Sequence, residues 1–177
     1  MDANTIIWIV TLLVTFVAAG VDWRSRRIPN WLTVPGLVSA VTLHAVLGGW
    51  HGTLFAAKGA GLALLLLLPL VLMRALGAGD WKLMGVVGAF LGPILFLFVL
   101  FGSILTAGLM AMVQMMRARR AADTFRNLIV LIRGFVVFGV KPNPQISLDN
   151  PKLLKLPFGI AVAAATLICF CAAHWSV

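Results

Sequence analysis

Charge is scarce in this sequence, and acidic charge is the scarcest kind. Charged residues make up 11% of the 177 residues, glutamate is absent, and five aspartates face 14 lysines and arginines. Any chemistry that needs carboxylates must therefore draw on a short set of side chains. This set consists of Asp2, Asp22, Asp80, Asp123 and Asp149.

Metal-ligating side chains are also few. The two cysteines, Cys169 and Cys171, lie within the last apolar run, and with one residue between them on a helix they point to different faces. His44 and His51 have no other metal-ligating residue type near them in the sequence, which favours interfacial polar residues over ligands. Zinc sites need about four such ligands. We therefore expect no metal and no cofactor.

Apolar residues are what the sequence has in excess. They make up 62% of the chain, and the mean hydropathy is +1.06. Runs that approach the ~20 residues needed to cross a bilayer indicate a helical membrane protein. The net charge of +9 comes from basic residues in the loops between these runs. We interpret them as determinants of topology and as contacts to anionic lipids, not as a nucleic-acid surface.

The apolar runs predict an all-α, polytopic membrane bundle with about six transmembrane helices in a single domain, residues 1–177. Residues 83–116 carry no charge and would rise about 51 Å as one helix, against a hydrocarbon core of about 30 Å. A break at Gly92-Pro93 resolves this excess and keeps all the arginine clusters on the cytoplasmic side, with both termini outside. The expected spans are 5–21, 31–47, 54–76, two segments within 83–116, and 157–173.

Residues 117–156 form the only sizeable predicted loop, and it is basic. Its segment 128–140 is apolar but short, which is typical of an interfacial segment and not of a span. Within the loop, we interpret Asp149 as a turn residue and Asp123 as a solvated partner for nearby arginines.

Two of the five aspartates fall at predicted cytoplasmic ends of spans. Asp22 follows the first span, and Asp80 precedes the fourth. A charge near bilayer depth costs about 2.5–3.5 kcal/mol, so such residues are usually paired, hydrated or functional. If the bundle brings Asp22 and Asp80 together, the two carboxylates will share one proton, which is the arrangement an aspartic protease needs. Simpler alternatives are an ion pair from Asp22 to a neighbouring arginine, and an ordinary helix cap and polar loop around Asp80.

Three motifs carry a family resemblance. Residues 22–30 (DWRSRRIPN) and 77–82 (GAGDWK) resemble the two signature motifs of the type IV prepilin peptidases, which are membrane aspartic proteases of the Gly-x-Gly-Asp kind. Residues 155–160 (KLPFGI) resemble the opening of that family's last span. The resemblance implies that Asp22 and Asp80 are catalytic and that the substrate is a prepilin or pseudopilin. Its short basic leader would be removed at the cytoplasmic face of the bacterial inner membrane, typically after a glycine.

This chain also departs from the larger relatives. They carry a cytoplasmic segment with cysteine pairs between the first two spans and also methylate the new N-terminus. The corresponding loop here has only a few residues and no cysteine. The resemblance therefore implies a peptidase without methyltransferase activity, similar to the compact peptidases of tight-adherence (Flp) pilus systems, with an Flp-type prepilin as substrate.

Several residues beside the aspartates are expected to support the site. Gly77 and Gly79 would serve a sharp turn and the close approach of a substrate. Lys82 would either extend toward the membrane surface, or stabilise the charge of Asp80 or meet an acidic residue of the substrate. The remaining supporting residues come from the first motif and are Arg27, Pro29 and Asn30.

Two other functions compete with this hypothesis. A non-enzymatic membrane subunit or small transporter would use Asp22 and Asp80 as a proton or cation relay. An intramembrane protease would use the same pair to cut transmembrane helices. A relay should place its carboxylates at the middle of the bilayer, whereas both aspartates here lie at span ends beside basic residues.

Overall fold

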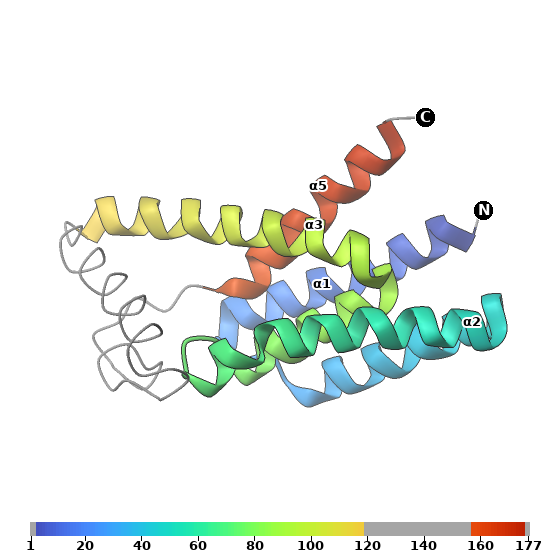
Figure 1. Ribbon diagram of the computed structural model, residues 1–177. Coiled ribbons are helices and arrows are strands. Elements are labelled where there is room, and N and C mark those ends of the chain that lie inside the picture. Colours follow the sequence, from blue (N-terminus) through green and yellow to red (C-terminus); the bar gives the residue numbers. More distant parts are fainter. Residues whose placement is uncertain (1–2, 119–156, 176–177) are drawn as a thin grey trace.

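Every helix expected from the apolar runs is present in the part of the chain that the structure describes. The computed structural model describes residues 3–118 and 157–175, which contain four helices and no strand. These are α1 (Ala3–Ser25), α2 (Asn30–Leu72), α3 (Ala78–Ala118) and α5 (Phe158–Trp175) (Figure 1). The predicted all-α class is confirmed. The predictions for loop 117–156 fall, beyond Ala118, outside the described residues.

The two longest helices each reverse direction at a glycine. α2 has 43 residues and α3 has 41. Gly49 interrupts α2 with a φ of 53°, and Gly92 interrupts α3 with a φ of 73°. Glycine adopts this left-handed region without the steric cost that other residues incur. Each helix therefore consists of two arms that double back on each other (Figure 1). The breaks fall where the sequence predicts them, in residues 48–52 and at Gly92-Pro93.

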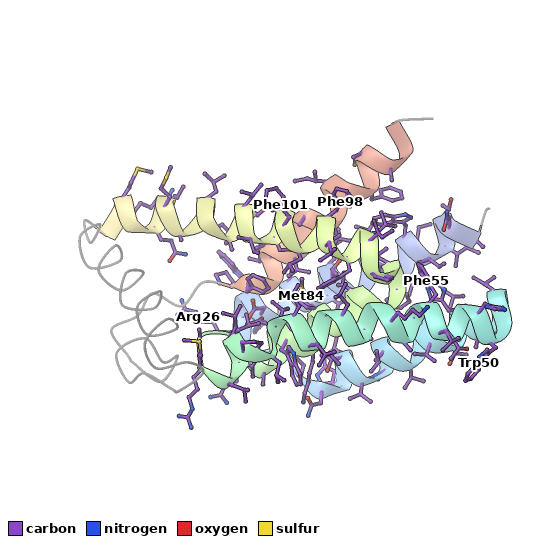
Figure 2. All side chains as sticks on the ribbon, in the orientation of Figure 1. Arg26, Trp50, Phe55, Met84, Phe98 and Phe101 are labelled. Atoms are coloured by element: carbon purple, nitrogen blue, oxygen red, sulfur yellow. The ribbon has the colours of Figure 1, made fainter. Side chains whose placement is uncertain are left out.

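The long helices are apolar enough to cross a membrane. The qualifying stretches, with mean hydropathies of 2.1, 2.1 and 2.5, are Ala3–Ser25, Asn30–Leu72 and Ala78–Gln114. Large apolar side chains also point outward. Phe98 and Phe101, on the second arm of α3, are 62% and 63% exposed (Figure 2). Such surfaces suit contact with lipid. The number of crossings and the side on which each terminus lies remain predictions.

The first arm of α3 forms the core of the bundle. Residues 83–92 are all buried. Both arms of α2 pack against this arm: Gly36 lies beside Val86, and Gly59 lies against the backbone of Gly88. The absence of side chains at Gly59 and Gly88 lets the two helices touch backbone to backbone, as in many membrane helix pairs. The first arm of α3, which is short for a transmembrane helix, is therefore covered by its neighbours.

The rings of His44 and Phe55 pack beside the break in α3. The interruption at Gly92 leaves carbonyls of the first arm without intrahelical partners. His44 Nε2 donates a hydrogen bond of 2.8 Å to the Phe90 carbonyl, and the Phe55 ring lies 5.3 Å from the His44 ring. The missing side chain at Gly92 makes room for the Phe55 ring. His44 is thus buried, at 8% exposure, and joins two helices, whereas the sequence suggested an interfacial position.

Candidate active site

Asp22 lies in the last turn of α1 and is buried. Its side chain is 4% exposed, although α1 continues to Ser25 and so extends a turn past the predicted span. The backbone N–H of Gly159, in the first turn of α5, donates a hydrogen bond of 2.8 Å to Asp22 Oδ2. A methyl group at position 159 would lie 3.1 Å from that oxygen and 3.1 Å from Asp22 Cβ. α5 can therefore approach Asp22 this closely because residue 159 is glycine.

Asp80 lies in the first turn of α3, at the same end of the bundle. The charge of Asp22 is close enough to Asp80 to act on its carboxyl electrostatically. Gly77 lies directly beside the Asp80 carboxylate, because a Cβ at this glycine would stand 2.9 Å from Asp80 Oδ2. Figure 2 marks this end by Arg26 and the opposite end by Trp50.

A four-residue loop between α1 and α2 passes over the start of α3. Arg26 ends α1 with a φ of 51°, and its N–H donates to the Asp22 carbonyl at 2.8 Å. Ile28 is buried and lies against Gly79, where a Cβ would stand 2.9 Å from the Ile28 carbonyl oxygen and 3.1 Å from its nitrogen. Gly79 is therefore the point at which this loop crosses the α3 backbone, which is a more specific role than the turn predicted for it.

The other supporting residues of the first motif lie at the start of α2. Pro29 precedes α2 in an extended conformation, and Arg27 is exposed. Lys82 Nζ donates a hydrogen bond of 2.9 Å to Asn30 Oδ1. This bond ties the start of α2 to the start of α3. It differs from both roles considered for Lys82 from the sequence, because the partner lies within the chain and is a neutral amide.

The simple alternative for Asp22, an ion pair with a neighbouring arginine, accounts for only part of its environment. Arg26, one turn later, does attract the carboxylate electrostatically. The hydrogen-bond donor to Asp22 Oδ2, however, is the backbone of α5. Within residues 3–118 and 157–175, no group of three or more histidine, cysteine or acidic side chains lies close enough together to hold a metal ion.

Sequence reasoning missed two residues of this site. Gly159 was noted only as part of a helix start, and it meets Asp22 across 137 positions of sequence. Ile28 was not singled out as a site residue, although its backbone packs against Gly79. The glycine of Pro157-Phe158-Gly159 was the one available signal, because a glycine in a first helical turn often marks a close approach.

The fold and this site define an all-helical membrane protein with two aspartates at one end of its bundle. The chain belongs to the type IV leader peptidase family, whose sequence model matches residues 9–112, more than half of its 177 residues. No curated protein and no solved structure matches the chain. The matched range includes both aspartates and ends before α5. The protein is therefore a membrane peptidase of this family.

Proposed function

We propose that the protein is a prepilin leader peptidase that hydrolyses its substrate with Asp22 and Asp80. The observation that carries the proposal is that two aspartates, both within the range matched by the leader peptidase family, lie at one end of the bundle, where the charge of Asp22 acts on Asp80. The Lys82 to Asn30 bond and the Ile28 to Gly79 contact support it, because they hold the α1–α2 loop against the start of α3.

The reaction uses the pair as acid and base. The ionised carboxylate takes a proton from water as the water oxygen attacks the scissile carbonyl carbon, and the protonated carboxyl gives its proton to the carbonyl oxygen. The resulting gem-diol collapses as the carbon–nitrogen bond breaks. The first carboxyl then protonates the leaving nitrogen, and a diol hydroxyl returns a proton to the second carboxylate. The products are a leader with a free carboxyl end and a pilin with a new amino end.

The substrate in this proposal is an Flp-type prepilin, cut between its basic leader and its hydrophobic helix at the cytoplasmic face of the bacterial inner membrane. The short connection between α1 and α2 supports a compact peptidase without methyltransferase activity, because only residues 26–29 separate the two helices. Exposed Arg24, Arg26 and Arg27 support the cytoplasmic assignment and contact with anionic lipid.

The test is a cleavage assay in membranes with an Flp-type prepilin from the same genome. Wild type is compared with Asp22→Asn and Asp80→Asn, and the new N-terminus is read by mass spectrometry. We expect wild type to remove a leader after a glycine, and each variant to lose about 10²-fold or more in rate while inserting normally. Cleavage that survives either change would remove that aspartate from the mechanism. An uncut prepilin, combined with ion flux that depends on the aspartates, would favour the transporter alternative.

A further inference from the structure

The start of α5 is built against Asp22 and lies outside the range that the family model matches. α5 begins at Phe158, so the Gly159 N–H is one of the first four donors of a helix, which have no partner inside it. In this protein that donor bonds to a buried carboxylate of another helix, at 2.8 Å. The helix dipole adds partial positive charge at the same place.

The contact depends on the absence of a side chain. A Cβ on Gly159 would stand 3.1 Å from Asp22 Oδ2 and 3.3 Å from the Ala18 carbonyl oxygen. Both neighbours belong to α1, and one of them is backbone. A methyl group would therefore push the start of α5 away from α1 and lengthen the hydrogen bond to Asp22.

The surroundings of the two carboxylates differ. Asp22 receives a donor from a separate helix and faces the positive charge of Arg26 one turn later. Asp80 also receives a backbone hydrogen bond, from Gly77 at the start of its own helix, but the neighbouring charge that acts on it is the like charge of Asp22. A hydrogen bond donated to a carboxylate favours its charged form, and so does a nearby cation. Both carboxyls accept a backbone hydrogen bond, and Asp22 has a cation beside it in addition, so of two carboxyls that share one proton Asp22 is the better place for the negative charge.

We propose that Gly159 is a positioning residue for the peptidase reaction, whose backbone N–H holds Asp22 as the ionised member of the pair. This inference rests on the proposed function and says which aspartate is the base and which is the acid. Asp22 takes the proton from water, through the oxygen that Gly159 does not hold, and Asp80 donates to the substrate carbonyl.

The first test compares Gly159→Ala with Gly20→Ala. Gly20 lies on α1 two residues before Asp22, is exposed, and has open space where a Cβ would be, so it is a matched control. The readout is the pH profile of kcat/KM for prepilin cleavage. For Gly159→Ala we expect the acidic limb, which reports ionisation of the base, to move up by about one to two pH units, with the basic limb unmoved. A moved basic limb, or a uniform loss of rate without a shift, would overturn the proposal.

A second test does not depend on cleavage. Asn at position 22 still offers an oxygen to the Gly159 N–H, whereas Ala does not, and both remove the charge. We expect Asp22→Ala to unfold in detergent at a temperature about 2–4 °C or more below that of Asp22→Asn. Equal temperatures would overturn the role of the bond. Failure of wild type to cut any prepilin would instead count against the proposed function, so the two failures are distinguishable.

Discussion

The two ends of the bundle share one kind of packing but carry different polar groups. At each end a glycine lets another segment pass close to α3: Ile28 at Gly79, and the Phe55 ring at Gly92. At the Phe55 end, the buried polar side chain is His44, and it is engaged with a backbone carbonyl. At the aspartate end, the polar side chains are the carboxyls of Asp22 and Asp80. Glycine packing alone therefore does not identify a site, and the difference lies in the polar groups beside it, an imidazole bonded to a carbonyl at one end and carboxyls at the other.

The comparison predicts that damage at the Phe55 end costs stability and leaves the chemistry intact. Gly92→Ala puts a methyl group into the Phe55 ring and forces a residue with a side chain to a φ of 73°. We expect a loss of about 2–4 kcal/mol in the free energy of unfolding, from backbone strain and overpacking together. Denaturant unfolding in detergent measures it. Gly108→Ala is the control, because Gly108 lies on the same helix with open space beside it. Cleavage per folded molecule should stay near wild type, and a selective loss of activity would contradict the comparison.

A substitution at the aspartate end should instead reduce activity more than it reduces stability. Gly79→Ala places a methyl group 2.9 Å from the Ile28 carbonyl oxygen, so the α1–α2 loop must shift, and with it the end of α1 that carries Asp22. Misplacement of a catalytic group by about 1 Å costs about 10²-fold in rate, so we expect kcat to fall about 10–100-fold. Steady-state cleavage kinetics give the value, with Gly61→Ala as the control at an open helical position. An unchanged kcat would mean that the loop does not position the pair.

The bond between Lys82 and Asn30 provides a smaller test at the same end. Lys82→Met keeps most of the stem and removes the donor to Asn30 Oδ1, so we expect a loss of about 0.5–1.5 kcal/mol in stability. If Lys82 acts only through this bond, Asn30→Ala will have the same effect on cleavage, and the double variant will be no worse than either single one. A rise in KM for Lys82→Met alone would show instead that Lys82 meets an acidic residue of the substrate.

The sequence predicted the helices better than it predicted the contacts around the two aspartates. The break at Gly92 was predictable because an uncharged run was too long for one span. The Gly159 donor was not, since a backbone N–H has no signature in sequence and its partner lies 137 residues away. The His44 bond to Phe90 escaped for the same reason: its acceptor is a carbonyl freed by a break that the structure alone places beside His44.

The smallest expected effect concerns the one buried side-chain atom that has no hydrogen-bond partner within the described residues, the hydroxyl oxygen of Thr33. Thr33 is 2% exposed and lies one turn into α2 from Asn30, at the aspartate end. Thr33→Val replaces the hydroxyl with a methyl group of similar size. Because the hydroxyl has lost its water and gained no bond there, we expect stability to change by less than about 0.5 kcal/mol or to rise.

The rate at which Thr33→Val cleaves prepilin then distinguishes two possible roles of the unpaired Thr33 hydroxyl. If the aspartate end differs from the Phe55 end only by its carboxylates, the variant will cut prepilin at the wild-type rate. If the hydroxyl is left open for water or for the substrate backbone, kcat/KM will fall while the unfolding temperature holds. Thr15→Val is the matched control, because Thr15 is equally buried on α1 and its hydroxyl already bonds to the Thr11 carbonyl at 3.0 Å. A fall in kcat/KM for Thr33→Val alone would extend the set of polar side chains that act at the aspartate end from two carboxyls to three groups.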